Sequence, residues 1–215
     1  MGKYKIGSLT HIIFDWSGTI SDDRKLVHEA NMRVLESHGL KRISYAKWLQ
    51  NADYNAVGFY RRMGISGDAD ELVLETISHF NHLKENGFAP SIYPGAEEAL
   101  RSIRSRGIDI SVLSGHPKSH VVDEARGYGI ETLFSRIIGS VKNKSKELLS
   151  LLREIPSQSA AYVGDMTYDI TSARAAGIMP ISVTTGYQNE SLLRYENPDL
   201  LVGSIAELDT ILRNR

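Results

Sequence analysis

Five consecutive residues near the start of the chain, Asp15-Trp16-Ser17-Gly18-Thr19, bring a carboxylate, a glycine and two hydroxyls together directly after an apolar run. A carboxylate delivered at the end of a buried strand is held in place, as a nucleophile requires. Gly18 lets the backbone approach a bound anion closely, and Thr19 offers that anion a hydroxyl and an amide. The pattern favours a nucleophilic aspartate beside a phosphate-binding turn.

Two further carboxylates, Asp165 and Asp169, follow a second apolar run four residues apart in the stretch Gly-Asp-Met-Thr-Tyr-Asp. If a helix begins between them, Asp169 lies one helical turn beyond Asp165. Carboxylate oxygens are the ligands that Mg²⁺ prefers, so Asp15 and Asp165 are predicted metal ligands. Asp169 is either a further ligand or a residue that supports the ligands without touching the metal. The alternative is purely structural, with the pair capping a helix and balancing its dipole.

A hydroxyl and a cation complete the candidate set. Ser114 ends another apolar run and is followed by Gly115 and His116, and Lys144 begins a helical pattern. Ser114 and Lys144 are predicted to hold phosphoryl oxygens, because phosphoryl transfer depends mainly on positioning and charge stabilisation. His116 either contacts substrate or is a surface imidazole. The neighbouring lysines at 142 and 146 compete with Lys144 for this role, so the choice among Lys142, Lys144 and Lys146 stays open.

These residues follow short apolar runs that alternate with helical patterns, which is typical of a doubly wound parallel α/β sheet. The expected strands are 11–16, 109–113, 136–140, 160–164, 179–183 and 200–202. Ligands bind outside the carboxyl ends of strands in such sheets. The polar residues at these ends are therefore predicted to converge on one site.

One long segment interrupts the alternation. From residue 22 to about residue 86 the pattern is helical, and the chain then returns through a stretch rich in Gly and Pro. We expect a catalytic core formed by residues 1–20 and 92–215, and a helical cap domain at 21–91. Within the cap, Arg61 and Arg62 are candidates to pair with a substrate carboxylate, with a solvated helix face as the alternative.

Taken in order, these motifs resemble those of the haloacid dehalogenase superfamily, and most closely its phosphoglycolate phosphatase-like branch with a C1-type helical cap. The resemblance covers nearly the whole chain. It implies an Mg²⁺-dependent phosphatase that hydrolyses small phosphomonoesters through an aspartyl-phosphate on Asp15, with phosphoglycolate as the best single substrate. Ser114, Lys144 and Asp165 correspond to the later motifs. The backbone carbonyl of Ser17 is the remaining metal ligand that the resemblance implies.

Ser17 departs from this family pattern, which has an Asp two residues after the nucleophile to protonate the leaving oxygen and activate water. A serine hydroxyl has no pKa near neutrality and is a poor substitute. His116 or a cap side chain is an alternative acid/base group. Two other functions stay open: a catalytically weakened protein that binds phosphorylated metabolites or partners, and carbon–phosphorus cleavage as in phosphonoacetaldehyde hydrolases.

Composition narrows the class of protein further. The chain has 215 residues, a formal net charge of −1 and no cysteine. The near-zero charge gives no electrostatic reason to expect nucleic acid or membrane as a partner. The lack of cysteine excludes disulfides, thiolate metal sites and a thiol nucleophile. No signal-type apolar segment follows Met1, so we expect a cytoplasmic protein whose partner is a small phosphorylated metabolite.

Overall fold

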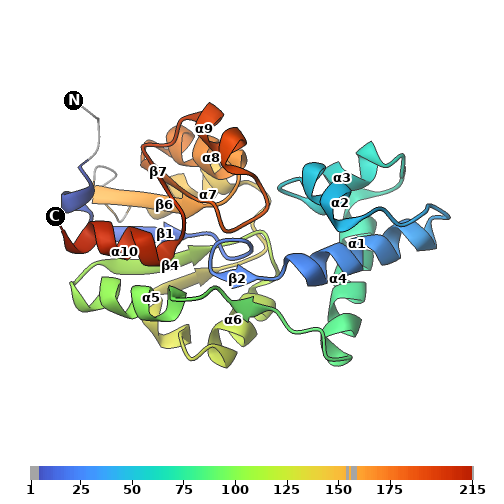
Figure 1. Cartoon of the computed structure of the whole chain (residues 1–215), viewed down its shortest axis with the longest axis horizontal. Coiled ribbons are helices and arrows are strands. Elements are labelled where there is room, and N and C mark those ends of the chain that lie inside the picture. The colour runs from blue at the N-terminus through green and yellow to red at the C-terminus, as the bar shows by residue number, and fades with distance from the viewer. Residues whose placement is uncertain (1–4, 154, 156–158, 215) are drawn as a thin grey trace. The chain divides into compact units, whose positions relative to one another are not determined.

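A computed structural model describes residues 5–153, 155 and 159–214. The chain forms two compact units (Figure 1). The core unit combines the residues up to Asp22 with those from Ser91 onward, and the helical unit runs from Asp23 to Pro90. These boundaries lie within two residues of the predicted ones, whereas the catalytic and capping roles assigned to the two units stay predictions. The first four residues, which bear on the predicted absence of a leader, lie outside the described residues.

The core unit is built on a parallel sheet of six strands in the order β5-β4-β1-β6-β7-β8. The strands are β1 (His11–Phe14), β4 (Asp109–Leu113), β5 (Arg136–Ile138), β6 (Ala160–Gly164), β7 (Met179–Val183) and β8 (Leu200–Val202). The chain starts in the middle of the sheet and winds out in both directions, which confirms the predicted fold class. β1 and β5 end two residues before their predicted ends, so Asp15 and Ser140 lie in the loops that follow these strands.

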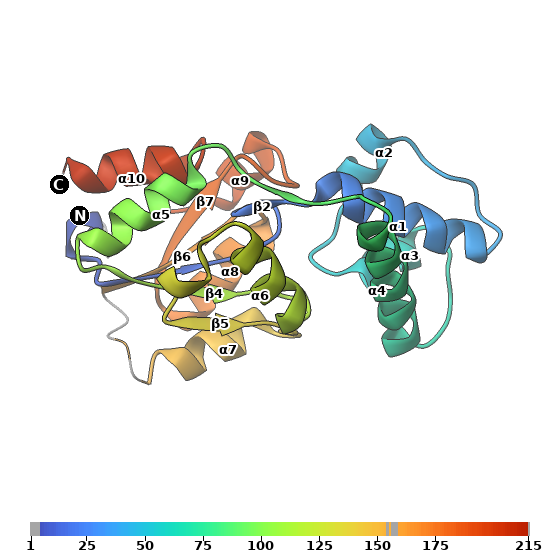
Figure 2. The same cartoon turned by 90° about the horizontal axis from the view of Figure 1, so that it is seen from below.

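Helices cover both faces of this sheet (Figure 2). One face packs against α5 (Ala96–Ser105), α6 (Lys118–Gly127) and α10 (Ile205–Arg213), and the other against α7 (Lys144–Leu151) and α8 (Thr167–Ala176). On β1, Ile12 and Phe14 enter the first core and Ile13 the second, as the two-residue period of a strand requires. A further helix, α9 (Glu190–Glu196), packs on α8, and two short 3₁₀ helices are η1 (Ile6–Ser8) and η2 (Glu131–Leu133).

The helical unit contains α1 (Arg24–Ser37), α2 (Tyr45–Gln50), α3 (Ala56–Arg62) and α4 (Ala69–Glu85). Each of the last three begins at a side-chain cap, supplied by Ser44, Asn55 and Asp68. Its small core includes Leu26 and Ala30 of α1 packed against Phe80 and Leu83 of α4. In the part of the chain that the structure describes, no helix has the length and apolarity needed to cross a membrane. The predicted cytoplasmic location stays a prediction.

A two-stranded antiparallel ladder joins the units. β2 (Ser21–Asp22) pairs with β3 (Ser91–Ile92), so the chain leaves and re-enters the core unit at one place. The sequence did not predict this ladder, because two residues are too few to show a strand period. Its position matters for the site, since β2 follows the nucleophile motif by only two residues.

Candidate active site

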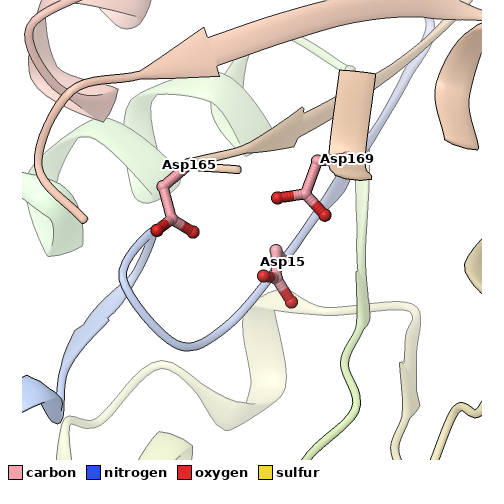
Figure 3. A group of neighbouring side chains, drawn as sticks. All are labelled: Asp15, Asp165 and Asp169. Carbon is pink, nitrogen blue, oxygen red and sulfur yellow. The ribbon is translucent and has the colours of Figure 1, made fainter. Parts of the chain in front are cut away.

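Three carboxylates lie together at the carboxyl ends of β1 and β6, which are neighbours in the sheet. Asp15 directly follows β1, Asp165 directly follows β6, and Asp169 lies in the first turn of α8. One oxygen from each carboxylate lies within 4.8 Å of the others, and the three side chains point toward one another (Figure 3). All three residues are buried. The predicted convergence of these strand ends is thus present in the structure.

Lys144, the first residue of α7, places its ammonium group against this cluster. Its Nζ lies 3.0 Å from Oδ2 of Asp15 and 2.7 Å from Oδ1 of Asp169. The lysine is itself buried, whereas Lys142 and Lys146 are exposed. Of the three lysines that the sequence left open, the structure brings Lys144 to the carboxylates.

Burial dominates the electrostatics of the cluster. It raises the pKa of Asp15 to about 6, against the opposing effect of the Lys144 ammonium. Burial and the neighbouring carboxylates of Asp169 and Asp15 hold the pKa of Asp165 well above its ordinary value. Burial by itself lowers the pKa of Lys144, but its ion pairs with Asp15 and Asp169 raise it well above the usual range. Three carboxylates therefore share one cation, which leaves an excess of negative charge.

The oxygen-rich donors of this cluster fit Mg²⁺, which prefers one or two carboxylates together with substrate oxygens and water. A divalent cation would offset the negative charge of the clustered carboxylates, which adds to burial in raising the pKa of Asp15 and Asp165. The predicted fourth ligand is the carbonyl of Ser17, two residues beyond Asp15. That assignment stays a prediction.

The nucleophile loop, residues 15–22, is packed tightly against Asp165. Gly18 has φ +75°, and a Cβ added to it would lie 2.4 Å from Oδ2 of Asp165, so this position requires glycine both conformationally and sterically. The Thr19 hydroxyl donates to Oδ1 of Asp165 at 3.2 Å. Thr19, predicted to bind phosphate, thus holds a candidate metal ligand in place, and its contact with phosphate stays a prediction.

The loop after β4 carries the predicted phosphate-binding residues Ser114, Gly115 and His116. Ser114 is buried, and its Oγ accepts a hydrogen bond from the backbone N–H of His116 at 3.2 Å. Because β4 pairs with β1 in register, Ser114 follows its strand at the same end of the sheet as Asp15. The structure describes this placement, and the roles of the three residues stay predictions.

Arg61 and Arg62 belong to α3 in the helical unit. The Arg61 guanidinium donates to the carbonyls of Ile65 and Gly67, and the Arg62 guanidinium pairs with Asp53 at 2.5 Å. Both side chains are thus bound within their own unit. Their predicted contact with a substrate carboxylate stays a prediction.

Sequence reasoning missed the residues that fix the nucleophile loop from behind. Glu124 of α6 is buried and accepts hydrogen bonds from Nε1 of Trp16 at 2.8 Å and from the Ser21 hydroxyl at 3.1 Å. The Trp16 ring also stacks on Tyr128, with ring centroids 6.0 Å apart. The one available signal was the position of Glu124 between Val121 and Ala125, on the apolar stripe of its helix.

Tyr187 also belongs to the site, although no catalytic or binding role was predicted for it. Its hydroxyl lies 3.0 Å from Oγ of Ser17, and its backbone N–H donates to Oδ2 of Asp165 at 2.7 Å. The residue follows β7 by four positions, and β7 is the neighbour of β6. Its position after a strand at the correct end of the sheet was the available signal.

Known proteins that resemble this chain show the family to which it belongs. The family model of haloacid dehalogenase-like hydrolases matches residues 12–183. A phosphoglycolate phosphatase from Synechococcus elongatus is 26% identical over 92% of this chain and 94% of its own. A phosphoglycolate phosphatase from Neisseria meningitidis is 26% identical over 92% of this chain and 91% of its own.

Solved structures share the fold at lower identity. The crystal structure described as a predicted phosphatase from Clostridium acetobutylicum has a TM-score of 0.83 and 18% identity, and the match covers 96% of this chain and 99% of the other. The family match spans the candidate site residues of the core unit from Asp15 to Asp169. The chain therefore belongs to the haloacid dehalogenase-like hydrolase family and is an enzyme of that family.

Proposed function

We propose that this enzyme is an Mg²⁺-dependent phosphatase of small phosphomonoesters that acts through an aspartyl-phosphate on Asp15. The observation that carries the proposal is the placement of the Lys144 ammonium between Asp15 and Asp169, with Asp165 completing the cluster. A carboxylate nucleophile, a fixed cation and a hard-metal donor set are the components that phosphoryl transfer requires. The phosphatase names of the relatives that match along most of the chain support the same reaction.

Each side chain then has a separate task. Asp15 attacks phosphorus, and its buried setting removes the water that would otherwise solvate the carboxylate. Lys144 orients the carboxylate of Asp15 and binds an equatorial phosphoryl oxygen, and Ser114 binds another. Held by Asp15, Asp165, Asp169 and the Ser17 carbonyl, Mg²⁺ would supply further charge stabilisation to the transferred group. Thr19 keeps Asp165 in position through its hydroxyl.

We propose phosphoglycolate as the first substrate to test, supported by the names of the two relatives. The helical unit is proposed to select the substrate as a cap. Replacing residues 23–90 by a short linker, with the β2–β3 ladder kept, is expected to broaden the range of phosphomonoesters hydrolysed and to slow turnover of the smallest ones. Kinetics across a substrate series would measure this change, and unchanged selectivity would assign substrate choice to the core unit.

Ser17 specifically favours a second candidate, a weakened member of the family that binds phosphorylated metabolites without turnover. One experiment separates the two functions. The chain is incubated with Mg²⁺ and a panel of phosphorylated metabolites that includes phosphoglycolate, and the release of inorganic phosphate is measured beside an Asp15→Asn control. Phosphate release that depends on Asp15 supports the phosphatase. Saturable binding without release from any member of the panel supports the binding protein and rejects the phosphatase.

A further inference from the structure

The hydroxyl of Tyr187 contacts the residue at which the nucleophile loop departs from the family pattern. Ser17 stands where the resembled enzymes have an acid/base Asp, and its Oγ lies 3.0 Å from Oη of Tyr187. Ser17 is partly buried, and Tyr187 is buried. Two neutral hydroxyls therefore meet at the position where a carboxylate is expected.

The Tyr187 side chain is held at this position by its own backbone segment. Its N–H donates to Oδ2 of Asp165 at 2.7 Å, and the Thr185 hydroxyl donates to the carbonyl of Gly18 at 2.9 Å. Between them, Gly186 packs so closely that an added Cβ would lie 2.0 Å from Oδ2 of Asp165. The segment 185–187 is thus fixed to both the nucleophile loop and Asp165, and these contacts fix the backbone from which the Tyr187 side chain extends to Ser17.

We infer that Ser17 and Tyr187 act as a hydroxyl pair, in which Tyr187 positions Ser17 to donate one hydrogen bond to the oxygen that leaves phosphorus. When Tyr187 donates to Ser17, the Ser17 proton is directed to a third oxygen. Ser17 is then a catalytic residue and Tyr187 a positioning residue. This inference rests on the proposed phosphatase function and specifies how its leaving group is stabilised.

The chemical step balances without a carboxylic acid at residue 17. An oxygen of Asp15 forms a bond to phosphorus while the bond between phosphorus and the leaving oxygen breaks, and its electron pair stays on that oxygen. The leaving oxygen takes its proton from a water molecule, and both hydroxyls keep theirs. The hydroxide that remains attacks phosphorus of the aspartyl-phosphate, and the bond between phosphorus and the Asp15 oxygen breaks, which restores the Asp15 carboxylate and releases hydrogen phosphate. The hydrogen bond from Ser17 strengthens as charge grows on the oxygen, so it stabilises the transition state more than the bound substrate.

A comparison of leaving groups tests the inference. A nitrophenolate stabilises its own charge, whereas the alkoxide released from phosphoglycolate does not. In Tyr187→Phe and Ser17→Ala, kcat/KM for phosphoglycolate is expected to fall about tenfold, the rate equivalent of one hydrogen bond. For p-nitrophenyl phosphate, the fall is expected to stay below about twofold. The double variant is expected to lose little more than either single variant, because the two hydroxyls act as a unit.

The matched control is Tyr93→Phe. The Tyr93 hydroxyl donates to the carbonyl of Thr185 at 2.9 Å, so this variant removes a tyrosine hydroxyl that contacts the same segment without changing the contact with residue 17. Its kcat/KM on both substrates is expected to match the parent. Equal losses on the two substrates, or full activity of both Tyr187→Phe and Ser17→Ala on phosphoglycolate, would overturn the hydroxyl pair. A parent chain that releases phosphate from neither of these substrates nor from any member of the metabolite panel would instead overturn the proposed function, and the inference with it.

Discussion

The two ends of β1 and β4 each carry a cluster of side chains typical of catalytic sites. At the carboxyl ends lie Asp15 and Lys144 with their partner carboxylates. At the amino ends, Nδ1 of His11 lies 3.4 Å from Oδ2 of Asp109, and its Nε2 lies 2.9 Å from Oγ of Ser111. The amino-end group, defined as His11, Asp109 and Ser111, has the residue types and order of contact of a serine hydrolase triad.

Their surroundings separate the two clusters. Ser111 has no exposed surface and is already hydrogen-bonded to Ser135, whereas Asp15 and Lys144 keep 6% and 8% of their surfaces exposed. Asp109 is also paired with Arg104. At the carboxyl ends, by contrast, α7 begins at Lys144 of the cluster, and Asp169 lies in the first turn of α8. The N-terminal ends of both helices carry a partial positive charge, which favours a bound anion. Contacts among residue types found in catalytic sites are therefore insufficient evidence of an active site. The side chains must also be accessible to a substrate, and the surrounding charges must favour its binding.

The largest expected effect is at Asp15. Asp15→Asn removes the nucleophile, and turnover is expected to fall on the order of 10⁴-fold or more, as when a nucleophilic constellation loses a member. The matched variant at the other end of the sheet is Asp109→Asn, for which we expect parental kcat. Phosphate release by the two purified proteins measures the contrast. An Asp15→Asn protein with substantial turnover would remove the distinction between the two ends.

The next effect is at Lys144. Lys144→Met removes the buried cation between Asp15 and Asp169, and kcat is expected to fall about 10²–10³-fold, the usual cost of losing one preorganised charge-stabilising group. Lys146→Met, two residues along the same helix and exposed, is the control and is expected to keep parental kcat. Equal activity of the two variants would show that the lysine only neutralises its neighbours.

The carboxylate cluster is also expected to bind Mg²⁺ without substrate. At a Mg²⁺ concentration of about 100 times Kd, mass action adds about 2.7 kcal/mol to the free energy of unfolding. Tm of the parent is therefore expected to rise when Mg²⁺ is added and to fall back to its metal-free value when EDTA is added. Asp165→Asn is expected to lose this rise, and Asp109→Asn to keep it. Differential scanning fluorimetry measures each protein, and a rise of Tm that survives Asp165→Asn would place the ion elsewhere.

The carboxyl-end cluster was largely predictable from the sequence. Asp15, Ser114 and Asp165 each directly follow an apolar run, and in a parallel sheet such positions gather at one edge. Four of the six strands match their predicted bounds, and the other two differ only at their carboxyl ends. These features depend on the local pattern of apolar residues and on the topology of the sheet, and short stretches of sequence indicate both.

The remaining contacts depend on tertiary packing and have little local signal. Tyr187 meets Ser17 across 170 positions of sequence, and Glu124 meets Trp16 across 108. The choice of Lys144 over Lys142 and Lys146 as the site lysine depended on two facts that come from the structure: α7 begins at Lys144, and Lys144 is buried. His11 looked like the first residue of an apolar strand, and nothing local indicated its contacts with Asp109 and Ser111.

The smallest expected effect on activity is at His11, where the change is instead in stability. Burial lowers the pKa of His11 below its ordinary value of 6.5, against the attraction of Asp109 and with the help of Arg136 and Arg104. As pH falls through 6.5, the unfolded chain binds a proton at this residue that the folded chain does not. The free energy of unfolding of the parent therefore decreases toward acid, and His11→Gln lacks this contribution.

Urea unfolding of the parent and of His11→Gln, measured from about pH 5 to about pH 8, tests this expectation, since their other titrating groups cancel in the difference. The stability of the parent relative to the variant is expected to fall as the pH is lowered. Meanwhile kcat/KM of the variant is expected to stay within about twofold of the parent, because surface and structural sites remote from the chemistry act mainly on folding. A folded His11→Gln protein without turnover would give the amino-end group a catalytic role and end the distinction between the two ends of the sheet.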